Sequence, residues 1–171
     1  PVFVLRNPFE VADSLLRRDG MPREYGLLLW SRYNLDAFRF LGQRQFSVLQ
    51  YERFLADWAT EVDRIAEELE FDWSKRPDEV SIEVSEFLDR SLRHHKHKQR
   101  DTGTGFVERL ASGVYEELVR GRSADKTVLE ALEAQLDDRI DGVDTALQFY
   151  AERRSRALSE RINVSEKMRA N

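Results

Sequence analysis

Residues 2–5 place four apolar side chains in a row, Val-Phe-Val-Leu. An uninterrupted run rich in β-branched and aromatic residues is typical of a strand buried on both faces, as in a parallel sheet. After it, Asn7 is a favourable helix N-cap, Pro8 fits the first helical position, and Glu10 stands where a capping box needs it. The sequence therefore predicts a strand, a tight turn and a helix over residues 8–18.

This unit places Arg6 at the carboxyl edge of a sheet, beside the free amides of a helix start. A phosphate at that edge gains charge-assisted hydrogen bonds from the guanidinium and a favourable interaction with the helix dipole. Ser14, two turns into the helix, offers a further hydroxyl donor. From the residues alone, the alternative is a surface arginine and a solvated serine.

Composition excludes several classes of site. The 171 residues are 41% hydrophobic and 35% charged, which fits one α/β domain with a charged appendage. There is no cysteine, so disulfides and thiolate metal sites are excluded. A net charge of −5 argues against general nucleic-acid binding, and no apolar run approaches the roughly 20 residues of a membrane span. We expect a cytoplasmic protein without a membrane or nucleic-acid partner.

The segment Arg6-Asn-Pro-x-x-Val-Ala-x-Ser14 resembles the part of sulfotransferases that holds the 3′-phosphate of 3′-phosphoadenylyl sulfate (PAPS). The similarity is greatest to bacterial members, and it extends to Val-Leu-Gln-Tyr-Glu at residues 48–52. The resemblance implies an α/β parallel-sheet fold similar to that of P-loop nucleotide-binding proteins. It also implies that Arg6 and Ser14 bind the 3′-phosphate, that Tyr51 meets the adenine, and that a sulfuryl group passes to a hydroxyl or amine acceptor.

Two parts of the family pattern are not in this chain. They are the Gly-rich loop that holds the 5′-phosphosulfate and the histidine upstream of the Arg-Asn-Pro segment. The resemblance therefore implies that residues 1–102 correspond to the C-terminal part of a sulfotransferase domain. We expect no catalytic residue in this chain and no catalysis by the chain alone.

The next segments complete an α/β pattern. Apolar residues at helical spacing predict a largely buried helix over residues 23–41, and the short apolar run 46–51 predicts a second, parallel strand. Asp57 is a plausible N-cap for a helix with an apolar inner face and a solvated side. That side carries five carboxylates, Glu61, Asp63, Glu67, Glu68 and Glu70. A further helix over residues 80–89 should bury Ile82, Val84, Phe87 and Leu88.

Residues 90–100 are basic and contain every histidine of the chain. His94 and His97 lack a third ligand at a plausible spacing, so we predict no metal site. The resemblance implies that this segment covers the cofactor, with Arg93 as the phosphate contact; the alternatives are a contact from a neighbouring basic residue or a solvated linker.

Residues 103–171 are predicted to form a helical tail. After a helix over residues 106–119, apolar residues recur with coiled-coil spacing from Leu129 to Tyr150. The sequence leaves three roles open for such a seam. It could form a dimer with a second copy, lead into a further domain, or fold back on its own domain. Two other functions stay open for the whole chain: a non-catalytic coiled-coil interaction module and a related kinase of P-loop fold.

Overall fold

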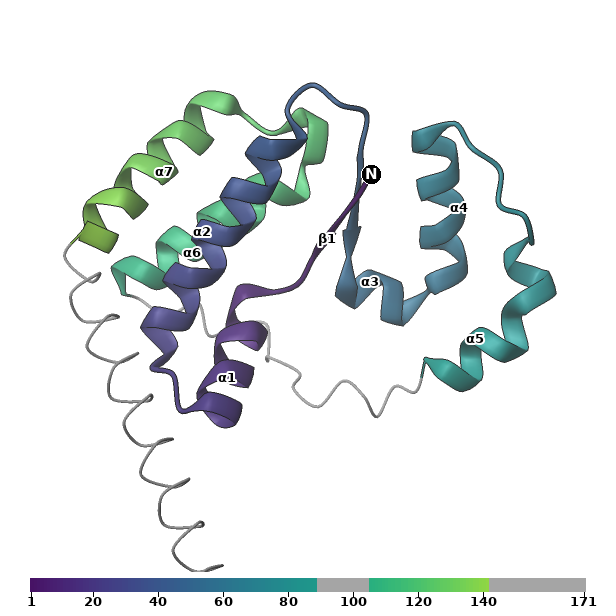
Figure 1. Ribbon diagram of the computed structural model, residues 1–171, viewed down its shortest axis with the longest axis horizontal. Helices are drawn as coiled ribbons and strands as arrows, with labels where there is room; N and C mark the ends of the chain where they lie inside the picture. The colour runs from purple at the N-terminus through teal and green to yellow at the C-terminus, as the bar shows by residue number, and fades with distance from the viewer. Residues whose placement is uncertain (89–104, 142–171) are drawn as a thin grey trace, which may run out of the picture. The chain divides into compact units, whose positions relative to one another are not determined.

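The computed structural model of the protein describes residues 1–88 and 105–141 (Figure 1). These residues are mostly helical and contain one two-stranded parallel sheet, so the predicted α/β class is confirmed at this level. The elements are β1 (Val2–Leu5), α1 (Pro8–Asp19), α2 (Arg23–Leu41), β2 (Ser47–Gln50), α3 (Tyr51–Ala56), α4 (Trp58–Leu69), the 3-10 helix η1 (Pro77–Val80), α5 (Ser81–Phe87), α6 (Phe106–Val119), the 3-10 helix η3 (Gly121–Ser123) and α7 (Lys126–Asp141).

The sheet confirms the predicted parallel pairing. β1 and β2 lie side by side, with Val2 opposite Ser47 and Leu5 opposite Gln50 (Figure 1). The connection between them runs through α1 and α2, as a parallel pair requires. β2 ends one residue earlier than predicted, because Tyr51 already begins α3.

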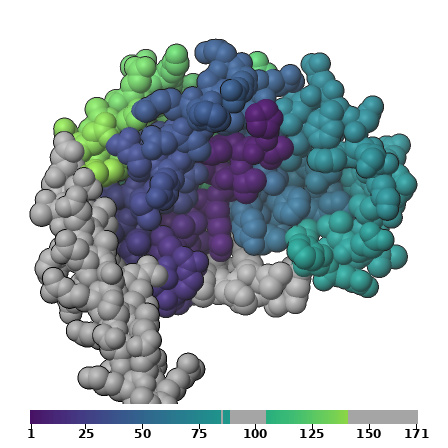
Figure 2. Space-filling model, viewed as in Figure 1, coloured from purple at the N-terminus to yellow at the C-terminus, as the bar shows by residue number. Residues whose placement is uncertain are grey.

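The prediction that β1 is buried on both faces is wrong for this structure. Phe3 and Leu5 are buried, but Val2 is 40% and Val4 57% exposed. Figure 2 accordingly shows the darkest purple part of the chain at the molecular surface. Helices cover only one face of this strand in the described part of the chain, and alternate side chains therefore meet solvent.

Helix α1 begins and ends as its sequence predicts. The Asn7 side chain accepts hydrogen bonds from the N–H groups of Phe9 and Glu10, and Gly20 ends the helix in the left-handed conformation at φ 66°. In the expected capping box, the Glu10 side chain would accept a hydrogen bond from the Asn7 N–H. Glu52 takes this role instead, since the Asn7 N–H donates to Glu52 Oε1 at 2.9 Å. A hydrogen bond thus joins the start of α1 to Glu52, one of the two residues that directly follow β2.

The core lies where α2 packs between α1 and α6. Helices α1 and α2 approach closely because Gly26 has no side chain: a Cβ there would lie 3.1 Å from the Cα of Ala12. On the other side, the Trp30 ring packs against Tyr115 of α6, with ring centroids 6.1 Å apart. The predicted helix over residues 23–41 agrees with α2 in both bounds.

The first part of the predicted coiled-coil seam folds back on its own chain. Leu129 and Leu136 are buried, and Leu132 lies against Gly113 of α6. These residues belong to a compact unit that spans Pro1–Leu136, and the chain from Asp137 onward forms a second unit. The seam from residue 142 to Tyr150 and the predicted boundary at residues 102 and 103 lie outside the described residues.

The prediction for residues 80–89 is partly wrong. Helix α5 forms, preceded by η1, but Ile82 and Phe87 are exposed instead of buried. Within the described ranges, no helix is both long and apolar enough to cross a membrane.

Candidate functional site

The carboxyl ends of β1 and β2 bring Arg6 and Tyr51 together. Each residue directly follows its strand, and parallel strands present their carboxyl ends at the same edge of a sheet. The Arg6 guanidinium carbon lies 4.9 Å from the centroid of the Tyr51 ring, which is a cation–π distance. Two of the four predicted site residues therefore meet, although they are far apart in the sequence.

Two carboxylates complete this cluster. Glu10 is only 2% exposed, and its Oε2 lies 3.5 Å from Nη2 of Arg6. Glu52 accepts the hydrogen bond of the Asn7 N–H through Oε1. Within the described residues, the buried atoms Arg6 Nε and Glu52 Oε2 have no hydrogen-bond partner. Since buried polar atoms are rarely left unpaired, these two mark a place for a further polar group.

The expected free amides at the start of α1 are not free. Phe9 and Glu10 donate to the Asn7 side chain, Val11 donates to the Asn7 carbonyl, and Asn7 itself donates to Glu52. Pro8 has no N–H to offer. The prediction that helix amides bind an anion here is therefore wrong, because the N-cap that starts the helix also satisfies its first donors. Any anion at this edge depends on side chains.

Ser14 and Arg93 are not joined to this pair. Ser14 is half-buried and lies four residues after Glu10, on the same face of α1. The described residues include no hydrogen bond between Ser14 and Arg6. Arg93 lies outside the described residues, as do the three histidines of the chain.

Tyr115 of α6 also faces the cluster, which the sequence did not predict. Burial of its phenol, followed by the negative charges of Glu52 and Glu10, together raise the pKa of Tyr115 from 10.0 to about 12. The helical pattern of residues 106–119 placed α6 against the core. It gave no signal for this contact, which depends on the packing of α6 against α2.

A second cluster surrounds Arg64 of α4, beside β2. Its guanidinium donates five hydrogen bonds, two to Glu61 and one each to Glu68, the Ser47 hydroxyl and the Val48 carbonyl. Glu61 is only 3% exposed and also pairs with Arg53. The expectation that Glu61 lies on the solvated side of this helix is therefore wrong.

The charges of this second cluster stabilise one another. Burial opposes the charged form of Arg64, but hydrogen bonds to Glu61 and Glu68 outweigh it and raise the pKa of the guanidinium. Burial likewise opposes the charge of Glu68, yet hydrogen bonds from Ser47 and Arg64 lower the pKa of that carboxyl. Arg64 is thus fully occupied and offers no donor to a ligand.

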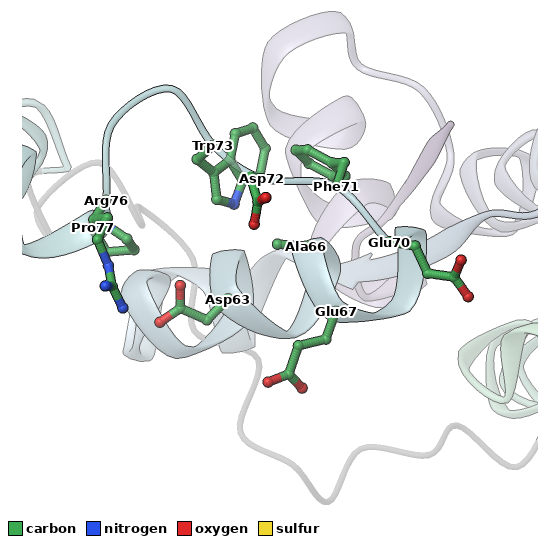
Figure 3. Close-up of a pocket in the computed structure, with 9 residues that line it drawn as sticks. All are labelled: Asp63, Ala66, Glu67, Glu70, Phe71, Asp72, Trp73, Arg76 and Pro77. Carbon is green, nitrogen blue, oxygen red and sulfur yellow. The ribbon is translucent and has the colours of Figure 1, made fainter.

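A hollow of about 730 Å³ lies along the other side of α4 (Figure 3). Phe71 and Trp73 form its aromatic wall, with ring centroids 4.5 Å apart, and the Trp73 indole donates to the Val62 carbonyl. Its acidic residues come from α4 and the following connection: Asp63, Glu67, Glu70 and Asp72. This surface repels anions, so it does not suit a phosphate. The described residues include no cluster of potential ligands that could hold a metal ion.

Comparisons of the chain with protein-family models, with curated protein sequences and with solved structures gave no match.

Proposed function

We propose that this chain is the nucleotide-binding part of a PAPS-dependent sulfotransferase, with a parallel-sheet fold similar to that of P-loop proteins. The observation that supports this most is the Arg6–Tyr51 pair at the carboxyl edge of the sheet. It combines a cation for a phosphate with an aromatic ring for a base, and Nε of the guanidinium has no hydrogen-bond partner among the described residues.

The residues of the cluster fit the 3′-phosphate end of such a nucleotide. Arg6 would bind the phosphate, Ser14 would donate its hydroxyl from α1, and Tyr51 would pack against the adenine. Glu10 would hold the guanidinium in place from the buried side. Because Glu10 also neutralises Arg6, a dianionic phosphate needs a second cation, and Arg93 of the basic segment is our candidate.

PAPS supplies the sulfuryl group when it is bound, and the acceptor is a hydroxyl or an amine. The proposal assigns no base and no sulfate-facing lysine to this chain. Its role is to hold and orient the nucleotide, which contributes to catalysis by fixing the geometry of an in-line transfer.

The test is a calorimetric titration of the 171-residue chain with adenosine 3′,5′-bisphosphate, which carries the 3′-phosphate but no sulfuryl group. We expect binding by the native chain and a roughly 10- to 100-fold loss in Arg6→Ala, because a hydrogen bond to a charged group contributes about 1.5–3 kcal/mol. Arg17→Ala is the matched control, since Arg17 is an exposed arginine of α1 outside the cluster.

Three results would argue against the proposal. A native chain that is folded by circular dichroism but does not bind would leave the coiled-coil interaction module as the better hypothesis. Equal binding by Arg6→Ala would place the nucleotide elsewhere. ATP bound more tightly than the bisphosphate would favour a kinase of related fold, because ATP has no 3′-phosphate.

A further inference from the structure

A second cavity, of about 350 Å³, lies beside β2 and has the opposite electrostatic character to the acidic hollow of α4. Its wall comes from α3, α4 and the turn after α6, and its floor from side chains of β2 and the residue before it. Four arginines converge on it. The arginines are Arg53, Arg64, Arg120 and Arg122, and apolar side chains beside them belong to Phe46 and Val48.

The cavity is held together by a close approach between η3 and β2. Gly121 has a φ of 57°, and a Cβ there would lie 3.0 Å from Cγ2 of Val48. A larger residue at this position would therefore be strained, and its Cβ would press on the Val48 side chain. The tight contact places the two arginines on either side of Gly121, Arg120 and Arg122, at the cavity.

The charge around the cavity is positive even though the chain carries a net charge of −5. Among the described residues, Glu68 is the only carboxylate that lines it. Two buried carboxylates form ion pairs with three of these arginines: Glu61 with Arg53 and Arg64, and Glu117 with Arg120. Within residues 1–88 and 105–141, four guanidinium groups thus face three carboxylates, which leaves a net charge of one positive unit.

The arginines differ in how many donors they have left. Arg64 is saturated. Arg53 reaches Glu61 through Nε at 3.0 Å, and Arg120 reaches Glu117 through Nη1 at 3.0 Å, so each retains further N–H groups. Arg122 is exposed and makes no ion pair or hydrogen bond within residues 1–88 and 105–141.

We infer that this cavity is an anion-binding site for a small molecule that carries a phosphate or sulfate ester on an apolar group. Arg53, Arg120 and Arg122 donate to the oxyanion, whose geometry matches the planar fork of a guanidinium. The apolar part packs on Phe46 and Val48. None of Arg6, Tyr51, Glu52 and Tyr115 lines this cavity, so the site is separate from the proposed nucleotide site.

The probe is phenyl phosphate, titrated into the isotope-labelled 171-residue chain and followed by NMR. We expect saturable shifts of the amides around the cavity, including Gly121. Arg122→Ala should weaken binding roughly 10-fold or more, because it removes a charge-assisted donor that no carboxylate holds. Arg122 is exposed, so this variant should fold, and Arg17→Ala should bind like the native chain.

Two further variants and a second probe separate this site from the proposed nucleotide site. Arg6→Ala should leave the affinity for phenyl phosphate unchanged, and Arg53→Ala should reduce it. Phenol, which lacks the anion, should not bind at the same concentrations. The inference is wrong if the native chain gives no saturable shifts, if Arg122→Ala binds equally well, or if only Arg6→Ala abolishes binding. That last result would still leave the proposed nucleotide site intact.

Discussion

Two arginines next to the sheet, Arg6 and Arg64, show how differently the same side chain is used in one protein. Arg64 lies along β2, where five hydrogen bonds to two carboxylates, a hydroxyl and a carbonyl leave it no spare donor. Arg6 lies at the end of β1, where one carboxylate is 3.5 Å away and, in the described part of the chain, a buried nitrogen has no hydrogen-bond partner. The first arrangement is complete without a ligand, and the second is not.

The difference shows which arginine stabilises the fold and which is available for binding. A saturated guanidinium acts on the free energy of unfolding, whereas one with an unpaired donor acts on ligand affinity. The following experiments test this contrast, in order of decreasing expected effect on stability.

Arg64→Ala should cause the largest change, lowering the free energy of unfolding by about 3 kcal/mol. The reason is that the buried carboxylate of Glu61 would lose one of its two arginine partners and keep only Arg53. Urea unfolding followed by circular dichroism measures this change. Arg17→Ala, on an exposed part of α1, should change it little. A loss in Arg64→Ala no larger than that of the control would show that the hydrogen bonds of Arg64 are dispensable.

Arg6→Ala should cost less stability than Arg64→Ala, about 1.5 kcal/mol, since it removes one long charged contact and a cation–π contact. The same urea experiment gives the number, and Arg6→Lys reports how much depends on the guanidinium. If Arg6→Ala were the more destabilising variant, the contrast between the two arginines would be reversed.

Asn7→Ala tests whether the helix start supports the Arg6 cluster. Loss of the cap should lower the free energy of unfolding by about 1 kcal/mol, because the N–H groups of Phe9 and Glu10 lose their acceptor. Asn7→Asp keeps a capping oxygen and should retain most of the stability. An unchanged unfolding midpoint in Asn7→Ala would mean that the cap adds nothing at this site.

Tyr115 provides the most local test, and its expected effect on stability is the smallest near neutral pH, where the phenol is protonated in both states. Its phenol holds its proton more tightly in the folded chain than in the unfolded one, because its pKa is raised to about 12. The resulting stability is present below pH 10 and falls as the pH rises through the raised value. Urea unfolding at several pH values between 10 and 12 should therefore show that the free energy of unfolding falls more steeply with pH in the native chain than in Tyr115→Phe. Equal slopes would show that the phenol is not in this environment.

The sequence predicted the local structure of the first fifty residues well, for physical reasons. Asn7 and Gly20 are strong helix signals that act over a few residues, and both bounds of α1 follow from them. The meeting of Arg6 and Tyr51 was also predictable, because two parallel strands share a carboxyl edge. Whether Ser14 and Arg93 bind the same anion stays a prediction.

The errors have a common cause, which is that long-range packing decided the outcome. Glu61 looked solvated because it lies among other carboxylates on α4, but Arg64 and Arg53 bury it beside β2. The Asn7 N–H looked free for the same reason, because its partner, Glu52, is 45 residues away. Nothing near Tyr115 in the sequence indicates Glu10 or Glu52 as neighbours.

The bond between Arg64 and the Val48 carbonyl also covers the outer edge of β2. Ser47 pairs with β1, so the next residue turns its backbone to the outer edge of β2, where Arg64 occupies the carbonyl at 2.7 Å. An incoming strand would have to displace a charged side chain to extend the sheet there. The Arg64 guanidinium thus hinders strand addition at this edge of β2. The other edge of the two-stranded sheet is β1, where Val2 and Val4 are exposed, and it is the more vulnerable edge for strand addition.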